Sequence, residues 1–419
     1  MNVVHLSTSD SGGGAARAAY RLHRGLQGLN IETEMYVRDK CSSNASVRAL
    51  NPDGHLAGKL RRLWRYGRIQ LAFAPYRLSR PNHLELFSDD RSRFREELVV
   101  QLPSADVYDL HWIVQFVDLQ AFFEHTTAPV VWTLHDMNAF TGGCHYNVGC
   151  ERYAASCGHC PQLGSAREQD LSRSVWSRKQ ATYRNAIHED RLHIAAPSEW
   201  LGREARRSEL LGEAPVHVIP NGLDHTTFRP RNEQKTRRGL GVPDGHNVVL
   251  FVAQSTTKHR KGFSLLAEAL GALDMEDTTL LSVGDGEPSL SGNLPHVHAG
   301  RIEDDEALSR VYSLADIFVI PSRQDNLPNT VLESMACGTP VVGFNVGGIP
   351  DMVRPSETGW LAETGNVREL RQAIETALEN DEERERMGRR CREVVGEEYT
   401  LERQARQYRA LYESVLNQQ

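Results

Sequence analysis

The stretch Pro321–Val353, PSRQDNLPNTVLESMACGTPVVGFNVGGIPDMV, decides the fold that this chain is expected to adopt. An apolar run that ends at Ile320 predicts a buried strand just before it. Pro328 suits the first turn of a helix, because its φ is already fixed and its missing N–H is not needed there. Gly338 and Pro340 then end that helix. The predicted elements are a strand, a polar loop, a helix over Asn329–Cys337, a strand over Val341–Phe344 and a further helix after the turn at Gly347 and Gly348.

Two carboxylates bracket the start of the predicted helix. Asp325 precedes the helix, and Glu333 lies inside it, eight positions later. Unpaired backbone N–H groups at a helix N-terminus favour an anion, above all a phosphate. The two carboxylates are placed to accept hydrogen bonds from hydroxyl groups on either side of such phosphates, which predicts a sugar-nucleotide site. The alternative is that both carboxylates are solvated surface groups beside an ordinary helix.

The composition bounds the class of protein. At 419 residues the chain should form two or three domains. Its 40% hydrophobic and 25% charged residues are typical of soluble proteins, and a net charge of −7 argues against a general nucleic-acid binder. No run of about 20 apolar residues is present. The opening MNVVHLSTSD lacks the layout of a signal peptide, and seven cysteines without an export signal suit a reducing compartment. These features predict a cytoplasmic protein.

The N-terminal part begins with a strand, a glycine loop and a helix. Val3–Ser7 reads as the strand, Gly12–Gly14 as the loop, and Ala15–Gln27 has helical spacing of its apolar residues. This order opens a Rossmann-like unit, in which glycines let a ligand approach the backbone. The strict G-x-G-x-x-G pattern is absent, so a purely structural turn is an equal alternative.

Two histidines follow further predicted strands. Val107–Trp112 and Val130–His135 read as parallel strands, with His111 and His135 near their C-terminal ends. Open α/β sheets bind their ligands at these ends of the strands. A lone histidine at such a position is more often structural than catalytic, and His111 is interpreted as structural.

Residues 55–80 form a basic stretch that is interleaved with apolar side chains. It contains no acidic residue. Such a stretch suits an anionic bilayer or an acidic acceptor. The alternative is an excursion packed on the N-terminal domain with its arginines solvated. The basic residues are Lys59, Arg61, Arg62, Arg65, Arg68, Arg77 and Arg80, and the apolar ones include Leu60, Leu63, Trp64, Leu71, Phe73 and Tyr76.

Four cysteines cluster in the loop 142–162. Cys144, Cys150, Cys157 and Cys160 lie within 17 residues, and the last two form a C-x2-C pair. This spacing suits tetrahedral thiolate ligation, so a structural zinc ion is the leading interpretation. Free buried thiols are the second alternative and disulfides the third. Nothing in the pattern indicates a catalytic metal with an open coordination position.

The C-terminal half is predicted to start near residue 215, just before a Pro-Asn-Gly turn at Pro220–Gly222. Asn247–Ala253 is its first predicted strand, and a polar loop then leads to Arg260 and Lys261. Two cations at a strand end, near the Asp325 element, are suited to neutralise a diphosphate. The alternative is a solvated basic turn.

Taken together, these motifs resemble those of the retaining glycosyltransferases of family 4. The pair Asp325 and Glu333 matches the Glu-x7-Glu signature, with Asp in the first position, and SMACGTPVVGFNVGGIPDMV continues the match. The motif I-P-N-G-x-D-x-x-x-F-x-P is complete in Ile219–Pro230. The resemblance covers nearly the whole chain and implies the α/β GT-B fold, with two Rossmann-like domains facing a central cleft. It places an acceptor domain at 1–210, a donor domain at 211–398 and a helix that crosses back to the first domain at 399–419.

The resemblance also implies an activity and a set of roles. The expected reaction moves a sugar, with retention and without a catalytic metal, from a nucleotide-diphosphate sugar to an acceptor hydroxyl. Lys261 and Arg260 would stabilise the leaving diphosphate, Glu333 would hold the ribose, and Asp325 and His135 would orient the sugar. The family usually has an arginine about six residues before this lysine. In this chain Gln254 or Ser255 occupies that region. Further donor contacts are implied for Gly13, Gly14, Asn326, Leu327, Asn329 and Thr330.

The sequence predicts the biological setting of the reaction only as a broad class. The family resemblance is to enzymes of exopolysaccharide, colanic-acid or O-antigen assembly, so the expected acceptor is a glycan or a lipid-linked oligosaccharide. The basic stretch 55–80 would make peripheral contact with the inner face of the membrane. The alternatives are a sugar-nucleotide epimerase or another enzyme of the same fold, and a non-catalytic protein that binds nucleotide sugars.

Overall fold

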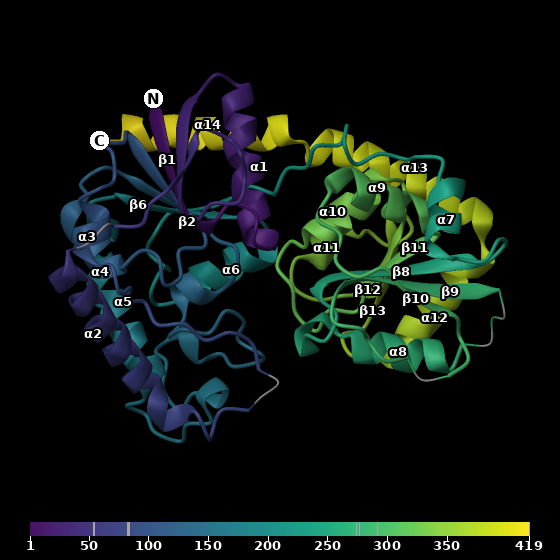
Figure 1. Ribbon diagram of the computed structural model, residues 1–419, viewed down its shortest axis with the longest axis horizontal. Coiled ribbons are helices and arrows are strands. Elements are labelled where there is room, and N and C mark those ends of the chain that lie inside the picture. The colour runs from purple at the N-terminus through teal and green to yellow at the C-terminus, as the bar shows by residue number, and fades with distance from the viewer. Residues whose placement is uncertain (53–54, 82–83, 274, 276, 291, 419) are drawn as a thin grey trace. The chain divides into compact units, whose positions relative to one another are not determined.

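The computed structural model describes residues 1–419 except 53–54, 82–83, 274, 276, 291 and 419. The chain forms two compact units, shown in Figure 1. Unit 1 comprises Met1–Pro220 with Gln404–Gln419, and unit 2 comprises Asn221–Arg403. The sequence-based divisions were placed at 210 and 398. Each unit is built on one sheet whose described strand pairs are all parallel, so the predicted α/β class is confirmed.

The sheet of unit 1 has the strand order β3-β2-β1-β4-β5-β6-β7. The order reverses between β1 and β4, as in a doubly wound Rossmann-like sheet. The elements of unit 1 are β1 (Asn2–Ser9), α1 (Gly14–Gly28), β2 (Glu32–Asp39), β3 (Val47–Ala49), α2 (Leu56–Phe73), α3 (Glu96–Val99), β4 (Val107–Leu110), α4 (Leu119–His125), β5 (Val130–Thr133), α5 (Leu171–His188), β6 (Leu192–Ala196), α6 (Glu199–Arg207), β7 (Val216–Val218) and most of α14 (Leu401–Asn417).

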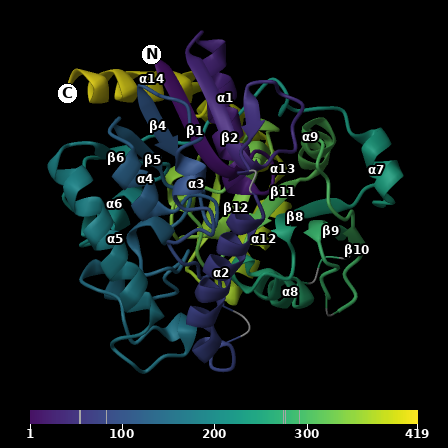
Figure 2. The same ribbon diagram turned by 60° about the vertical axis from the view of Figure 1, so that its left-hand side comes forward.

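Both faces of this sheet are covered. Because side chains alternate along a strand, Val3 and Val4 of β1 enter different cores. Val3 packs with α1 and with Tyr408 and Tyr412 of α14, so the last helix completes the cover of this face. Figures 1 and 2 show α14 lying beside β1. Val4 packs in the larger core with residues of α3, α4, α5 and α6. Burial on both faces explains why the strands read as continuous apolar runs.

The sheet of unit 2 has the order β10-β9-β8-β11-β12-β13, with its reversal between β8 and β11. One face packs against α9, α10 and α13, and the other against α8 and α12. The elements are α7 (Gln234–Leu240), β8 (Asn247–Ser255), α8 (Phe263–Gly271), β9 (Thr278–Asp285), β10 (His296–His298), α9 (Asp305–Leu314), β11 (Ile317–Ile320), α10 (Asn329–Ala336), β12 (Val341–Phe344), α11 (Ile349–Met352), β13 (Gly359–Ala362), α12 (Val367–Glu379) and α13 (Asp381–Glu398).

Several predicted boundaries shift. The strands expected to reach Trp112 and His135 end at Leu110 and Thr133, so that both candidate histidines lie just beyond their strands.

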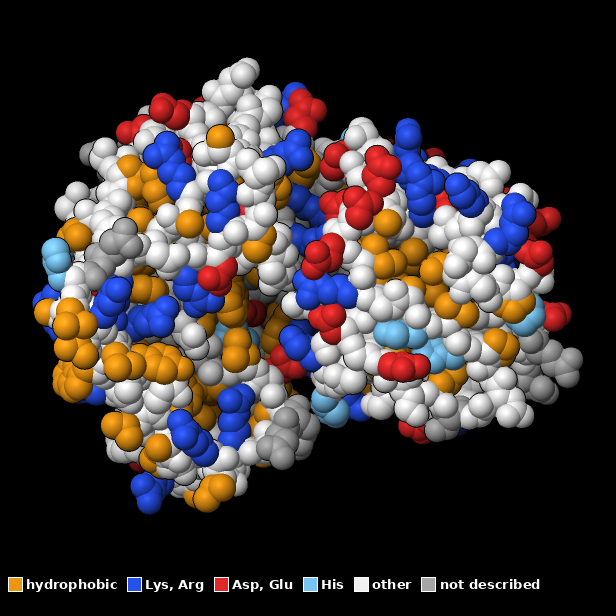
Figure 3. Space-filling model, viewed as in Figure 1, with side chains coloured by type: hydrophobic (Ala, Val, Ile, Leu, Met, Phe, Trp, Pro, Cys, Tyr) orange, Lys and Arg blue, Asp and Glu red, His pale blue; other side chains and the backbone are white. Residues whose placement is uncertain are grey.

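Helix α2 presents an unusual surface. Several of its large apolar side chains point to solvent, whereas Ala72 and Phe73 near its C-terminal end pack against a small core, and Gly58 is buried. In Figure 3, hydrophobic and basic side chains mix over the part of unit 1 where Figure 1 places α2. The exposed fractions are 75% for Leu56, 58% for Leu60, 67% for Leu63, 62% for Trp64 and 70% for Leu71.

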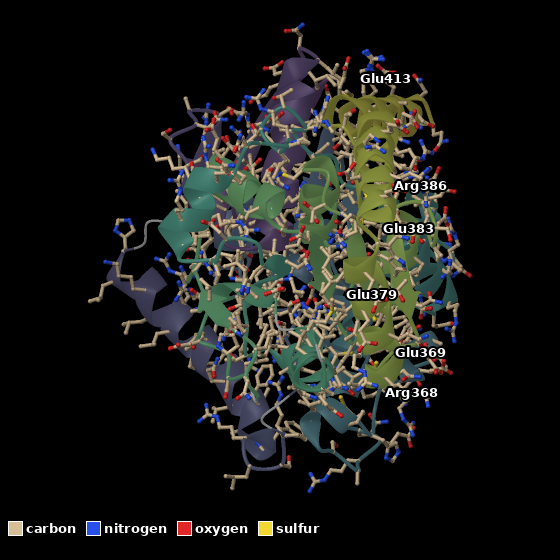
Figure 4. All side chains as sticks on the ribbon, turned by 90° about the vertical axis from the view of Figure 1, so that its right-hand side faces the viewer. Arg368, Glu369, Glu379, Glu383, Arg386 and Glu413 are labelled. Carbon is tan, nitrogen blue, oxygen red and sulfur yellow. The ribbon has the colours of Figure 1, made fainter. Side chains whose placement is uncertain are left out.

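The outer helices of unit 2 behave differently. Arg368 of α12 and Arg386 of α13 project away from the ribbon in Figure 4. Arg386 forms a surface ion pair with the partly exposed Glu383 at 3.4 Å. This is a solvated face, as the interleaved charges predict. Within the described residues, no helix combines the length and apolar character needed to cross a bilayer.

Candidate functional site

Each sheet has a topological switch point, and the candidate residues follow the strands that flank these points. Parallel α/β sheets bind ligands outside the carboxyl ends of the strands at the reversal of strand order. In unit 1 the flanking strands β1 and β4 lead to the loop before α1 and to His111. In unit 2 the flanking strands β8 and β11 lead to Lys261 and Asp325.

The cations and the carboxylate of unit 2 form one group. Lys261 Nζ donates to Asp325 Oδ2 at 2.6 Å, and Arg260 Nη1 lies 3.2 Å from Asp325 Oδ1. Ser322 Oγ also donates to Asp325 Oδ2, at 3.1 Å. Arg260 Nη1 makes a second hydrogen bond, to the carbonyl oxygen of Gln324 at 2.8 Å. The structure thus brings together the two cations and the first carboxylate of the eight-residue spacing.

Two glycines allow the loops of this group to meet. Gly262 has φ +73°, and a Cβ there would lie 1.8 Å from the carbonyl oxygen of Pro321. Gly347 has φ +60°, and its Cβ would lie 1.8 Å from the carbonyl oxygen of Asp325. Any side chain at either position would push the backbones apart. The pairing of Lys261 with Asp325 therefore depends on close backbone contact between the loops after β8, β11 and β12.

Electrostatics keep the group charged. Burial acts to raise the pKa of Asp325, but Lys261 and Arg260 outweigh it and lower this pKa to about 2. Burial lowers the pKa of Lys261, and Asp325 opposes that shift. The carboxylate is ionised near neutral pH, and the two adjacent cations leave the group with an excess of positive charge.

Helix α10 contributes the second carboxylate. Glu333 is 2% exposed and accepts a hydrogen bond from the Tyr312 hydroxyl at 3.2 Å. Pro328 is the N-cap, and Asn329 at the start of the helix accepts a hydrogen bond from Asn221 at 3.1 Å. The solvated-carboxylate alternative is wrong for both positions, since Asp325 is also only 5% exposed.

In unit 1, His135 belongs to a group of buried polar side chains. His111 Nδ1 and His135 Nε2 are 3.1 Å apart, and His5 Nδ1 and His111 Nε2 are 3.0 Å apart. Asp109 lies beside them and accepts a hydrogen bond from the Tyr412 hydroxyl at 2.6 Å. His5, Asp109 and Tyr412 are not among the site residues predicted from the sequence. The spacing of Asp109 two positions before His111 was the available signal, because such residues share one face of a strand.

The glycine loop leads directly into α1. Gly13 is its N-cap, with φ 119°, and its carbonyl oxygen accepts from the Arg17 amide at 3.0 Å. Asp10 fixes the preceding turn by accepting hydrogen bonds from the amides of Cys41 and Ser42, at 2.8 and 2.9 Å. The loop at the switch point of unit 1 is thus held by its own backbone and by the segment that follows β2.

The four cysteines line one cavity of about 20 Å³. Cys157 Sγ accepts a hydrogen bond from the Gly142 amide at 3.1 Å, and burial raises the pKa of Cys157 to about 12. Among the described residues, the group of potential metal ligands whose atoms all lie within 4.8 Å of one another is His5, Asp109 and His111. The four thiols therefore share a cavity but are spread more widely than in a closed tetrahedral site, where sulfur atoms are about 3.8 Å apart.

Comparisons with known proteins cover both units. The sequence profile described as "Glycosyltransferase Family 4" matches residues 12–227, and that described as "Glycosyl transferases group 1" matches residues 232–394. The chain is 27% identical over 209 residues to N-acetyl-alpha-D-glucosaminyl L-malate synthase of Bacillus anthracis, covering 48% of this chain and 54% of that protein. It is 30% identical over 218 residues to a sulfoquinovosyl transferase of Arabidopsis thaliana, covering 48% and 42%. The chain thus spans about half the length of these curated relatives.

Solved structures agree with the fold of the entire chain. Sucrose-phosphate synthase from Thermosynechococcus elongatus superposes with a TM-score of 0.68 at 20% identity, covering 100% of both chains. Anabaena HepE, solved in complex with UDP-glucose, gives 0.65 at 17% identity, covering 99% of this chain and 100% of that one. The predicted GT-B fold with two Rossmann-like domains is confirmed, while the cleft between them stays a prediction. Because the family profile matches more than half of the residues, the chain belongs to glycosyltransferase family 4.

Proposed function

We propose that the protein transfers a sugar from a nucleotide-diphosphate sugar to an acceptor hydroxyl, with retention of the anomeric configuration. The observation that carries this proposal is the group formed by Lys261, Arg260 and Asp325 at the switch point of unit 2. Its excess positive charge suits a diphosphate, and its position matches that of nucleotide sites in doubly wound sheets. Membership of the family supports the same activity.

The chemistry follows from where charge develops. Cleavage of the bond between the sugar and the diphosphate leaves negative charge on the phosphate, and preorganised cations stabilise that charge. Lys261 and Arg260 are held in place by Asp325 before a donor arrives. Binding of the diphosphate would then share these cations between the phosphate and Asp325. In this proposal Asp325 positions the cations as well as orienting the sugar.

The remaining residues complete the donor site. Glu333 would accept hydrogen bonds from the ribose hydroxyls, and His135 would contact the sugar. The leaving phosphate itself would take the proton of the acceptor hydroxyl, so the reaction needs no catalytic metal. Backbone groups of the loops and helix starts would bind the phosphates and the base; these residues are Gly13, Gly14, Asn326, Leu327, Asn329 and Thr330.

A panel of UDP-, GDP-, ADP- and dTDP-sugars tests the proposal by thermal shift. A donor present at about 100 times its Kd stabilises the native state by about 2.7 kcal/mol. For a unit of this size, that corresponds to a rise in melting temperature of roughly 5–10 °C. We expect one base to give this shift, and turnover of that donor in the presence of acceptor glycans. A shift without turnover in any acceptor mixture would favour a binding protein, and product formed without acceptor would favour an epimerase.

We also propose that α2 docks the enzyme on an anionic lipid surface, where a lipid-linked acceptor would be found. Leu60, Leu63 and Trp64 lie on an exposed apolar side, and Lys59 and Arg61 beside them are also exposed. An exposed apolar stripe flanked by cations suits the interface of an anionic bilayer. The assembly of surface polysaccharides is the setting in which such an acceptor is expected.

The structure corrects one expectation about this stretch. Both interpretations of the stretch place Arg62 and Arg65 on the surface, in contact with a bilayer or with solvent, but their side chains are only 12% and 14% exposed. Arg65 pairs with Glu96 and Glu97 at 3.1 Å each, and Arg62 lies 3.6 Å from Glu97. These two arginines fasten α2 to unit 1, so the membrane contact is assigned to the leucines, Trp64 and the exposed cations.

Vesicle sedimentation tests the membrane contact. The combined change Leu60→Ser, Leu63→Ser and Trp64→Ser should weaken partitioning onto vesicles that contain anionic lipid at least about tenfold, because each side chain loses apolar burial. Val100→Ser is the matched control, since Val100 is 68% exposed elsewhere on unit 1. Equal sedimentation of the triple variant and the wild type, or no binding of the wild type at low salt, would refute the docking role.

A structural zinc ion at Cys144, Cys150, Cys157 and Cys160 remains part of the proposal. The shared cavity and the amide hydrogen bond to Cys157 support it, since thiolates that bind metals accept such hydrogen bonds. The sulfur atoms would have to move closer together when the ion binds.

Metal analysis and thermal melting test the zinc proposal. We expect about one equivalent of zinc per chain and a melting temperature that falls by several degrees after chelation, because bound metal stabilises the folded state. Cys157→Ser should remove both effects, whereas Cys41→Ser, at an exposed cysteine outside the loop, should change neither. Zinc-free protein whose melting temperature is insensitive to chelator would leave the four residues as free thiols.

A further inference from the structure

Three imidazoles of unit 1 form a continuous hydrogen-bonded series, here called the histidine row: His5, His111 and His135. The register of the sheet explains the row. His5 of β1 pairs with Asp109 of β4, and His111 follows Asp109 by two positions on the same face. Thr133 ends β5, and His135 follows it by two positions in the same alternation. The row therefore lies on the face of the sheet that α1 and α14 cover.

Burial disfavours the charged forms of His111 and His135. It lowers the pKa of His111 to about 3 and that of His135 to about 4. A neutral imidazole carries one N–H donor and one bare nitrogen that accepts. A histidine that accepts one hydrogen bond of the row must therefore donate the next one. Two arrangements are possible: donation runs either from His5 to His135 or from His135 to His5.

His5 Nε2 decides between these directions. Among the described residues this buried atom has no hydrogen-bond partner. A buried N–H without a partner is costlier and rarer than an unpaired acceptor, so Nε2 is the bare nitrogen and Nδ1 carries the proton. A second proton on His5 would create the same unpaired N–H. His5 Nδ1 then donates to His111 Nε2, and His111 Nδ1 donates to His135 Nε2.

Asp109 holds the beginning of the row. Its Oδ2 lies 3.5 Å from His5 Nδ1 and 3.6 Å from His111 Nε2, so it faces the proton between these nitrogens. Tyr412 donates to Asp109 Oδ2 at 2.6 Å, and Thr133 donates to Oδ1 at 2.8 Å. Tyr408 lies 3.1 Å from Thr133 Oγ1. The carboxylate is thus oriented by hydroxyl groups, one of them from the last helix.

We propose that His5, acting through His111, is a positioning residue that holds His135 in the tautomer with its proton on Nδ1. His135 Nε2 is then occupied as an acceptor inside the row, and Nδ1–H is the group with which this histidine donates. The consequence for the reaction depends on the function proposed above for His135. The tautomer itself does not depend on that function.

Nuclear magnetic resonance of histidine labelled with ¹⁵N tests the tautomer directly. In the wild-type protein we expect the Nδ1 signal of His135 to be that of a protonated nitrogen and the Nε2 signal that of a bare one. His5→Phe should produce a mixture of tautomers at His135. His5→Asn should restore the wild-type pattern, because its amide nitrogen can replace Nδ1 as the donor to His111. An Nε2–H tautomer in the wild-type protein, or no change in His5→Phe, would overturn the proposal.

Kinetics separate this proposal from the function on which its consequence rests. His5→Phe should lower kcat at least about tenfold with little change in the KM for the donor, as expected for a wrong tautomer, and His5→Asn should recover most of kcat. His23→Phe is the control, because His23 is buried next to His5 but bonds to Thr33 and Ser46 instead of the row. The expected tautomer change with an unaltered rate would support the row and overturn the role of His135 in catalysis.

Discussion

Lys261→Met should lower kcat/KM for sugar transfer by about 10²–10³, the effect of removing one preorganised group that stabilises developing negative charge. Methionine keeps the aliphatic length of lysine but removes the charge. In the wild-type structure the ammonium group is fixed 2.6 Å from Asp325, so no reorganisation is needed when the diphosphate leaves. Steady-state kinetics with the donor identified by thermal shift measure the loss.

The matched control for this change is Lys258→Met. Lys258 lies in the same loop but is exposed. Among the ion pairs of the described residues it has no carboxylate partner, whereas Lys261 is paired with Asp325. It should keep nearly all of the wild-type rate. A rate of Lys261→Met within a factor of about three of the wild type would show that leaving-group stabilisation lies elsewhere, provided that its melting temperature stays close to that of the wild type.

Asp325→Asn should destabilise unit 2 by about 2–3 kcal/mol, because Lys261 and Arg260 would be left partly buried without their carboxylate. Chemical denaturation at neutral pH measures this difference. Asp244→Asn is the control, since Asp244 is exposed in the same unit. We also expect the nucleoside diphosphate of the donor identified by thermal shift to stabilise Asp325→Asn more than the wild type, because the phosphates no longer share the cations with a protein carboxylate.

The pH dependence of this difference follows from the depressed pKa of Asp325. The folded value of about 2 lies below the ordinary value of 3.8, so the folded state binds fewer protons than the unfolded state between these values. The stability contributed by Asp325 is therefore fully present above the unfolded pKa and is lost as the pH falls through the folded pKa. The excess stability of the wild type over Asp325→Asn should be constant near neutral pH and shrink below about pH 4. An excess that instead grew in acid would contradict the ionised pair.

Much of the fold and part of the site could be predicted from the sequence. The helix that starts after Pro328 and the strand Val341–Phe344 are found where proline geometry and the apolar run placed them. Asp325 and Glu333 were chosen as a pair because their spacing matches a family signature. The sequence predicts that Lys261 lies near the element of Asp325, but it does not predict their direct contact. That contact depends on the close backbone approach at Gly262, which local sequence does not encode.

Other parts of the site needed the tertiary structure. The histidine row depends on the register between β1 and β4, and no local pattern gives the pairing of His5 with Asp109. The sequence also could not predict that the apolar side of α2 faces solvent, since an amphipathic helix has the same periodicity whichever of its faces packs against the protein. The ion pairs of Arg62 and Arg65 with α3, the burial of Gly58 and the packing of Phe73 show which side faces the protein.

The position of α14 has a consequence for how the protein is made on the ribosome. The apolar side chains of β1 around Val3 emerge first, yet Tyr408 and Tyr412, which cover that face, are translated only after all of residues 221–403. All residues of unit 2 have therefore been synthesised while unit 1 still exposes an apolar surface. The nascent N-terminal unit is therefore the part most exposed to aggregation during synthesis, until the final helix docks.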